Sequence, residues 1–124
     1  MLTNKELEVL EILWSTDKPL SRAEIVALSG NKWSPTSIHA FLNGLIAKGV
    51  VQVAGFFKLG KSVGRTYEPI VTKESYMVSQ MVKSKPKLAN IVSAFLDDEH
   101  YDKSTIDELE AIIQQKKREW GIDS

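Results

Sequence analysis

The segment 34–51 constrains the fold most strongly, because it encodes both ends of a helix and the start of a strand. Ser34 followed by Pro35 predicts an N-cap and a first-turn proline. Gly49 predicts a left-handed residue directly after the helix. The residues that follow, VVQVAGFF, are β-branched and aromatic, as is typical of a strand. A helix therefore gives way to extended chain with almost no loop between them.

Two earlier helices are predicted by capping boxes, in which a hydroxyl and a carboxylate bond each other's backbone. Thr3 and Glu6 fit the first box, and Ser21 and Glu24 fit the second. Pro19 must end the first helix, because its ring cannot sit in a helix interior. Three helices thus precede the strand.

The strand is followed by the turn-forming stretch KLGKSVG and by a second extended stretch, RTYEPIV, which predicts a β-hairpin. Three helices and then a hairpin is the element order of a winged helix-turn-helix. We therefore expect a mostly α fold with a small β-hairpin. Residues 1–71 are predicted to form a winged helix-turn-helix DNA-binding domain, in which the hairpin, residues 50–69, is the wing.

The remainder, residues 72–124, is predicted to be a C-terminal helical dimerisation region. Thr72 can cap a helix, Pro86 should interrupt it, and a last helix should be capped near Ser104. Apolar stripes on these short helices have little protein to pack against, so a second subunit is the simplest cover. The stripe residues are Leu88, Ile91, Val92, Phe95, Leu96, Ile106, Leu109, Ile113 and Trp120.

The third helix has two different faces on a helical wheel. Ile38, Leu42 and Leu45 share the side expected to face the core. The other side carries small polar groups that can bond base edges in the major groove, and alanine, which can approach a thymine methyl. The predicted base-reading residues are Thr36, Ser37, His39, Ala40 and Asn43. The same face could instead be an ordinary solvated surface, and His39 is more typical of a surface hydrogen-bonding residue than of a metal ligand.

Positive charge for DNA phosphates is available at the ends of the third helix and on the hairpin. The predicted phosphate-binding residues are Lys32, Ser34, Lys48, Lys58, Lys61 and Arg65. Residues 1–70 carry 8 Lys and Arg against 6 Asp and Glu, and residues 71–124 carry 8 against 10, so the asymmetry is mild. Lysines at turns also protect sheet edges, which is the alternative role for those on the hairpin.

Composition excludes several classes of protein. The chain has no cysteine, so disulfides and thiolate metal sites are absent. No stretch is apolar enough for a membrane span or a signal peptide, and we expect a cytoplasmic protein. No phosphate-binding glycine loop, zinc-protease motif or serine elbow occurs, so we expect no enzyme, no cofactor and no bound metal.

Several segments together resemble the penicillinase-repressor family, which includes BlaI and MecI and the copper-responsive CopY relatives. These segments are LTNKELEVLEILW, PLSRAEIVAL, WSPTSIHAFLNGLIAKGVV, GRTYEPIVTKESY, IVSAFL and STIDELEAII. The resemblance runs almost from end to end. It implies a homodimeric repressor that binds a palindromic operator with its winged helix and dimerises through its C-terminal helices. It also implies control of β-lactam resistance genes or related stress genes.

Family members are typically released by a membrane-bound receptor-protease that cuts an Asn-Phe bond, and the matching bond here is Ala94-Phe95. Alanine in place of asparagine is a departure from that cleavage site. The absence of cysteine removes the copper-sensing motif, and the wing is longer than usual. The reading face also lacks the basic residues often found there, so we expect an operator different from the family's familiar one.

A second hypothesis is a winged-helix module that binds protein and not DNA. A chain of zero net charge with an uncharged reading face is compatible with either role, because the fold does not fix the function. Salt dependence of duplex binding distinguishes the two.

Overall fold

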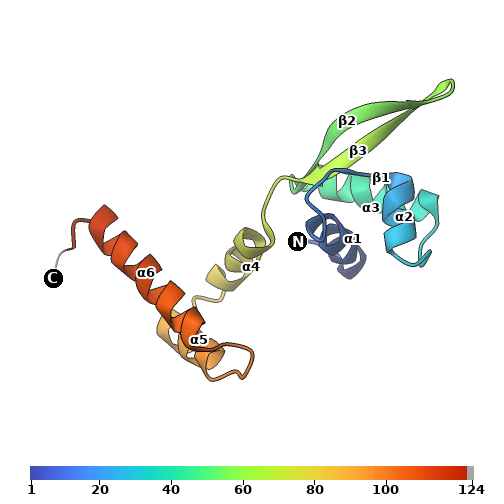
Figure 1. The fold of residues 1–124 in the computed structure, drawn as a ribbon. Helices are drawn as coiled ribbons and strands as arrows, with labels where there is room; N and C mark the ends of the chain where they lie inside the picture. Colours follow the sequence, from blue (N-terminus) through green and yellow to red (C-terminus); the bar gives the residue numbers. More distant parts are fainter. Residues whose placement is uncertain (123–124) are drawn as a thin grey trace. The chain divides into compact units, whose positions relative to one another are not determined.

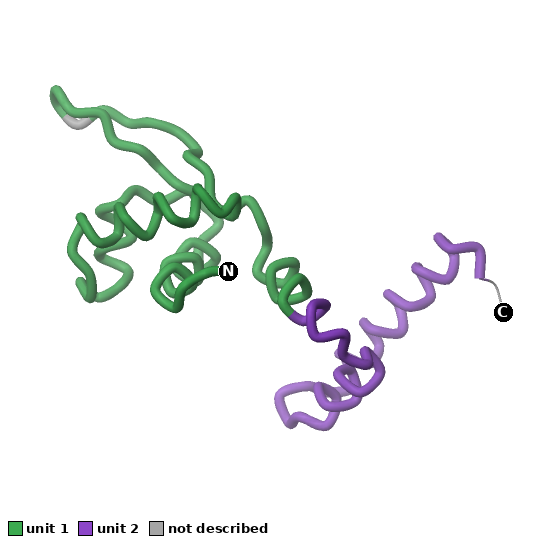
Figure 2. The backbone as a smooth tube through the Cα atoms, turned by 180° about the vertical axis from the view of Figure 1, so that it is seen from behind, with its two compact units in different colours: residues 1–80 green, residues 81–124 purple. Residues whose placement is uncertain are grey.

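A computed structural model describes residues 1–122, with Leu59 described by its backbone alone. The protein is mostly α-helical with a small antiparallel sheet, and it is a winged helix-turn-helix followed by further helices (Figure 1). The elements in chain order are α1 (Asn4–Trp14), β1 (Leu20–Ser21), α2 (Arg22–Leu28), α3 (Pro35–Ala47), β2 (Val51–Leu59), β3 (Ser62–Pro69), α4 (Lys73–Val82), α5 (Leu88–Leu96) and α6 (Lys103–Glu119). The chain forms two compact units, Met1–Gln80 and Met81–Ser124 (Figure 2).

The predicted helix ends are confirmed by their hydrogen bonds. Both capping boxes are complete, at Thr3 for α1 and at Ser21 for α2. The Ser34 hydroxyl accepts the Ser37 backbone N–H at 3.1 Å and caps α3. Gly49 follows α3 with φ 77°, a left-handed conformation that glycine adopts at no steric cost. Local sequence signals therefore set the ends of the first three helices.

The sheet has one strand more than the predicted hairpin. Its order is β1-β3-β2, with Leu20 opposite Tyr67 and Ser21 opposite Thr66. The two-residue strand β1 follows Pro19, where the sequence predicted only a helix break. A strand of two residues has no periodicity of its own and exists only through its pairing with β3. It fixes the base of the wing against the start of α2.

One hydrophobic core holds α1, α2, α3 and the base of the sheet together. The side chains on the predicted apolar side of α3 are buried, including Ile38, Leu42 and Leu45 at 0% exposed. Among the residues whose side chains the structure describes, the buried apolar ones are Val9, Leu10, Leu13, Leu20, Ile25, Ile38, Leu42, Leu45, Val51 and Tyr67. The opposite side of α3 is thereby turned outward.

The start of α4 is attached to α1. The Trp14 indole N–H donates to the Val71 carbonyl at 2.9 Å, and the Trp14 ring lies 5.8 Å from that of Tyr76. Lys73 forms an ion pair with Glu11 at 3.1 Å. The Thr72 hydroxyl accepts the Ser75 N–H at 3.0 Å, as its predicted capping role requires. The N-terminal unit therefore continues into α4.

The C-terminal unit contains α5 and α6, and Pro86 lies in the break between α4 and α5, as predicted. The N-cap of α6 is Asp102, whose carboxylate accepts the Ser104 N–H at 3.0 Å, so the predicted cap near Ser104 is two residues late. Phe95 packs edge-to-face on Tyr101 with ring centroids 5.7 Å apart. None of the described residues 81–122 is buried.

Candidate nucleic-acid interface

The outward side of α3 carries the predicted base-reading residues. Thr36, His39, Ala40 and Asn43 are exposed, and Ser37 is half-buried. The Ser37 hydroxyl is hydrogen-bonded at the start of α3, because it lies 3.1 Å from the Ser34 hydroxyl. Four of the five side chains are therefore accessible to a partner, and whether that partner is DNA remains a prediction.

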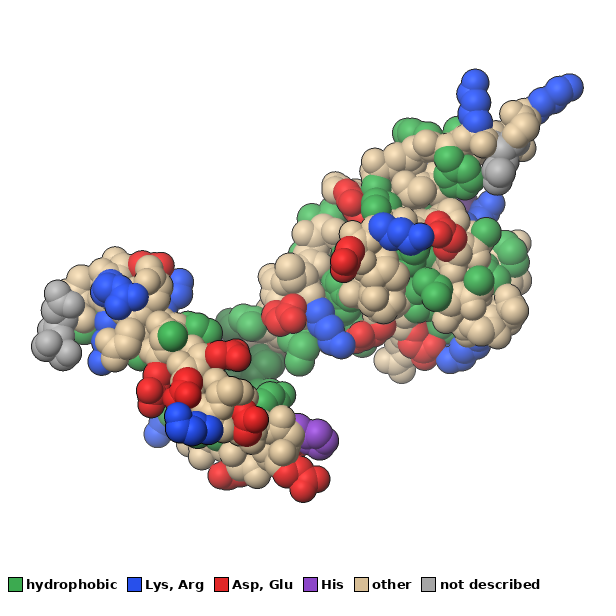
Figure 3. All heavy atoms as spheres, in the orientation of Figure 1, with side chains coloured by type: hydrophobic (Ala, Val, Ile, Leu, Met, Phe, Trp, Pro, Cys, Tyr) green, Lys and Arg blue, Asp and Glu red, His purple; other side chains and the backbone are tan. Residues whose placement is uncertain are grey.

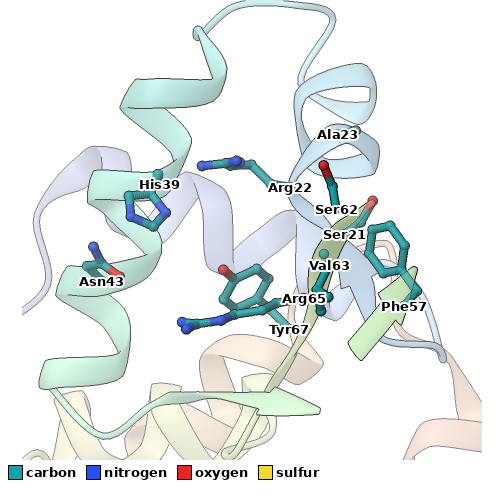
Figure 4. Close-up of a pocket in the computed structure, with 11 residues that line it drawn as sticks. Ser21, Arg22, Ala23, His39, Asn43, Phe57, Ser62, Val63, Arg65 and Tyr67 are labelled. Carbon is teal, nitrogen blue, oxygen red and sulfur yellow. The ribbon is translucent and has the colours of Figure 1, made fainter. Parts of the chain in front are cut away.

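A cavity of about 600 Å³ lies between α3, the start of α2 and the wing. From α3 it is lined by His39 and Asn43, and from the wing by Arg65 and Tyr67 (Figure 4). Thr36 and Ala40 do not line this cavity. The structure thus brings two predicted base-reading residues to the same place as one predicted phosphate-binding residue.

Arg22 is a further cation in this cavity that the sequence analysis missed. It is the first residue of α2 and is exposed, and in Figure 4 its guanidinium points towards α3 and His39. Arg65 extends towards the same helix from β3. The Ser21 capping box placed Arg22 at a helix start, but only the pairing of β1 with β3 shows that this helix start lies next to the wing.

The wing concentrates the free positive charge of the N-terminal unit. Between Val53 and Tyr67 the sequence has the cations Lys58, Lys61 and Arg65 and no Asp or Glu. All three side chains are exposed. Figure 3 shows blue side chains extending from the end of the hairpin, with no red beside them in that view. A chain of zero net charge therefore has a local basic projection next to the exposed side of α3.

Lys48 forms a partly buried ion pair with Glu6. Its ammonium lies 2.5 Å from Glu6 Oε1, and the Thr3 backbone N–H donates to the same oxygen at 2.8 Å. Glu6 is 6% exposed, and a Cβ at position Gly44 would lie 2.0 Å from its other oxygen, so a larger residue there would require the Glu6 carboxylate to move. The ammonium that was predicted to bind DNA phosphate thus already has a partner on α1.

The pKa of Glu6 reflects two opposing effects. Burial raises the pKa, whereas the hydrogen bonds from Lys48 and Thr3 and the charge of Lys48 lower it. The net pKa lies below the ordinary value for glutamate. Glu6 is therefore held as a carboxylate inside the N-terminal unit.

Lys32 also has a partner within the protein. Its ammonium lies 2.8 Å from Glu8 and 4.9 Å from the centroid of the Trp33 ring. The pair is exposed, with 58% of the Lys32 side chain accessible, so the lysine can exchange partners at small cost. Its role at phosphate stays a prediction.

The predicted dimer stripe lies on the C-terminal unit. Leu88, Phe95, Ile106, Ile113 and Trp120 are exposed, and Ile91, Val92, Leu96 and Leu109 are half-buried. A groove of about 540 Å³ runs between α5 and α6, lined by Leu88, Ala89, Val92, Ser93, Leu96, Asp97 and Ile113. The bond Ala94-Phe95, which matches the family's cleavage site, lies in the last turn of α5.

Other kinds of site receive no support from the described residues. No group of three or more metal-ligating His, Asp or Glu side chains occurs within residues 1–122. Over the same range, every helix is too short or too polar to cross a lipid bilayer.

Comparison with protein-family models gives a match over most of the chain. A family model described as "Penicillinase repressor" matches residues 2–115. A comparison with curated proteins finds no match.

Among solved structures, the adhesin competence repressor AdcR from Streptococcus pyogenes is 12% identical, with a TM-score of 0.42, covering 96% of this chain and 80% of that one. The Hop2-Mnd1 complex from Giardia lamblia is 14% identical, with a TM-score of 0.41, and the match covers 93% of this chain and 77% of that one. These two similarities are too weak to carry an argument about function.

Proposed function

This chain belongs to the penicillinase repressor family, and we propose that it is a homodimeric transcriptional repressor that reads a palindromic DNA operator with α3. The observation that carries the proposal is the cavity where His39 and Asn43 on α3 lie beside Arg22 and Arg65. Groups that can bond base edges and groups that can bind phosphate are there accessible from one side.

The proposal divides the contacts between positioning and specificity. Arg22, Lys58, Lys61 and Arg65 neutralise phosphates and set the orientation, which is independent of sequence. His39 and Asn43 bond base edges, and Thr36 and Ala40 extend the reading face towards the start of α3. An uncharged reading helix is compatible with DNA binding because the neighbouring elements supply the cations.

Dimerisation is part of the proposal because one α3 covers only one half-site. Two half-sites related by symmetry require two copies of the chain, and linking them raises the affinity for the full operator. The exposed apolar stripe of the C-terminal unit, with Ile113 53% and Trp120 72% exposed, is the surface we assign to the second copy.

Selection of binding duplexes from a random pool, followed by salt titration, tests DNA reading. We expect one palindromic sequence to be enriched, with an affinity that falls steeply as salt rises. Asn43→Ala should relax the preference at one position, by about 1 to 3 kcal/mol of discrimination. Lys61→Ala should weaken binding to all duplexes alike.

Lys103→Ala is the matched control for Lys61→Ala, because this lysine is also exposed, at 87%, but lies on α6. It should leave duplex binding unchanged. Absence of duplex binding at every salt concentration would overturn the proposal in favour of a module that binds protein.

The genes and the release signal are further parts of the proposal. We assign to this repressor control of β-lactam resistance or related stress genes, and release by a membrane-bound receptor-protease. Ala94-Phe95 lies within the helix α5, so its cleavage requires local opening of that helix. A genome-wide footprint would identify the genes. An intact chain in cells exposed to a β-lactam would exclude this release route.

A further inference from the structure

The cavity between α3 and the wing contains a hydroxyl group whose hydrogen-bonding capacity the fold does not use. Tyr67 is 4% exposed and belongs to the hydrophobic core, but it also lines this cavity. Its hydroxyl forms no hydrogen bond with a described residue, yet no fully buried polar atom of these residues lacks a partner, so the hydroxyl is open to the cavity. Figure 4 shows it directed towards the space between Arg22 and α3. Buried tyrosines usually have a hydrogen-bond partner, so a group that enters the cavity is the expected one.

Two arginines line the same cavity, and neither has an acidic partner among the residues that the structure describes. Arg22 and Arg65 are exposed, and the ion pairs of the described residues all involve other side chains. The described lining contains no Asp or Glu. Two guanidinium groups directed at one space repel each other, and an anion between them removes that cost. The planar fork of arginine matches a carboxylate with two parallel hydrogen bonds. The cavity is therefore suited to an anion.

The remaining lining favours an organic anion over an inorganic one. Ala23, Phe57 and Val63 contribute apolar side chains. The Phe57 ring occupies the space that a Cβ at Gly64 would need, so the absence of a side chain at Gly64 lets the ring pack there. The volume of about 600 Å³ lies within the range of about 300 to 1,000 Å³ that is typical of cavities for small molecules. An inorganic anion would leave the apolar side of this cavity uncovered.

We propose that the cavity binds a small organic carboxylate with an aromatic or aliphatic body, and that the bound carboxylate displaces DNA. The carboxylate accepts hydrogen bonds from the Tyr67 hydroxyl and from the guanidinium groups of Arg22 and Arg65, and the body packs against Phe57 and Val63. The displacement rests on the proposed function, in which the same two arginines bind phosphates. One guanidinium fork cannot hold a ligand carboxylate and a phosphate in the same geometry.

A DNA duplex does not account for the Tyr67 hydroxyl. The side chains that we assign to base reading, such as His39 and Asn43, are exposed on the outward side of α3. Tyr67, at 4% exposed, is accessible only to a group small enough to enter the cavity. Concave sites with a few well-placed polar groups are typical of small-molecule recognition. The Tyr67 hydroxyl therefore provides a way to separate ligand binding from DNA binding.

Calorimetry of the full-length protein without DNA tests the ligand site by itself. The probes are benzoate and 2-naphthoate. Their neutral amides keep the body without the charge, and acetate keeps the charge without the body. We expect 2-naphthoate to bind with a Kd of about 0.1 to 1 mM, which is ordinary for a ligand of this size. The amides and acetate should bind about tenfold more weakly, because each lacks one half of the recognised groups.

Tyr67→Phe locates the bound probe, because it removes the hydroxyl and keeps the ring in the core. It should weaken 2-naphthoate binding about tenfold, the size expected for loss of a hydrogen bond to a charged group. Tyr76→Phe is the matched control, because it makes the same change in a half-buried tyrosine on α4, outside the cavity. It should leave the affinity unchanged. Circular dichroism should report unchanged folding for both variants.

Displacement is measured as the ratio of operator affinities without and with ligand. At a 2-naphthoate concentration about ten times the wild-type Kd, the operator affinity of the wild type should fall about tenfold. Acetate at the same ionic strength should have little effect. At the same 2-naphthoate concentration the ratio for Tyr67→Phe should be only about twofold, because the ligand is then near the Kd of this variant.

The outcomes separate this inference from the proposed function. Absence of binding by both aromatic carboxylates overturns the inference and leaves the repressor proposal standing. Binding that Tyr67→Phe leaves unchanged also overturns it, as would be seen if the probe occupied the groove between α5 and α6. Ligand binding with unchanged operator affinity overturns the displacement. Absence of duplex binding at every salt concentration overturns the proposed function, and calorimetry still decides the ligand site.

Discussion

The two units of the chain differ in where their apolar side chains go. In the N-terminal unit, ten of the apolar side chains that the structure describes, from Val9 to Tyr67, are buried, several at 0% exposed. In the C-terminal unit, Leu88 is 70% exposed and Ile113 is 53% exposed, although α5 and α6 are clearly amphipathic. The first unit therefore buries its core within one chain, whereas the second presents an apolar surface that is not covered within it.

The difference follows from the number of elements available in each unit. Three helices and a sheet can surround a core from several sides. The 9 residues of α5 can cover only part of the apolar stripe of α6, which has 17 residues. An isolated helix as short as α5 is marginal in water. We infer that the N-terminal unit is stable by itself and that the C-terminal unit gains its stability from a second copy.

The largest expected effect is on the core of the N-terminal unit. Leu42→Ala should lower the free energy of unfolding by about 3 to 5 kcal/mol, because Leu42 is 0% exposed and truncation leaves a cavity. Ile113→Ala, measured at a concentration where the chain is monomeric, should cost less than about 1 kcal/mol. Urea unfolding followed by far-UV circular dichroism, which reports the helices of both units, measures both changes. Equal losses would show that the two units are alike in packing.

Local signals account for the part of the fold that the sequence predicted. Capping boxes at Thr3 and Ser21, the Ser34-Pro35 start of α3 and the Gly49 end each act within a few residues. The wheel of α3 likewise depends only on the helical period, and its two faces are confirmed by burial. The family resemblance stated from the quoted segments is confirmed by the match over residues 2–115.

Long-range contacts account for what the sequence did not predict. Strand β1 exists through its pairing with Tyr67, 47 residues away from Leu20, and the same pairing brings Arg22 to the cavity. The ion pair of Lys48 with Glu6 joins residues 42 apart. A β-bulge after Val53, where β2 has one residue more than β3, depends on the register of the two strands. None of these has a signature in a single stretch of sequence.

The second prediction concerns the uncovered surface of the C-terminal unit. Ile113→Asp introduces a charge at the groove between α5 and α6, and we expect a monomer with about a hundredfold lower affinity for the full operator. Sedimentation and operator binding measure the two effects. Gln114→Asp, an exposed neighbour that does not line the groove, should change neither. A wild-type protein that is already monomeric at micromolar concentration would contradict the dimer.

The smallest expected effect is the change in stability when one ion pair is removed from each unit. Glu6 in the N-terminal unit is buried beside Lys48, whereas Asp107 in the C-terminal unit pairs with Lys103 while 58% exposed. Glu6→Gln should cost about 1 to 2 kcal/mol at neutral pH, because a charge-assisted hydrogen bond is lost in a partly buried site. Asp107→Asn should cost less than about 0.5 kcal/mol, because exposed pairs are screened by solvent.

Acid titration sharpens this last prediction. The folded pKa of Glu6 is lowered, so its contribution to stability is complete above the unfolded pKa, about 4.3. It is lost as the pH falls from there through the folded pKa, because the unfolded chain takes up the proton first. Glu24, Asp98 and Asp102 also have lowered pKa values from nearby hydrogen bonds, so Glu6→Gln should reduce the acid loss and not abolish it. Urea unfolding of both variants between neutral and acid pH measures the stability that each loses on acidification. The opposite result would be a loss of stability at acid pH that Glu6→Gln leaves unchanged and Asp107→Asn reduces. It would place the stronger ion pair in the C-terminal unit and would contradict the comparison.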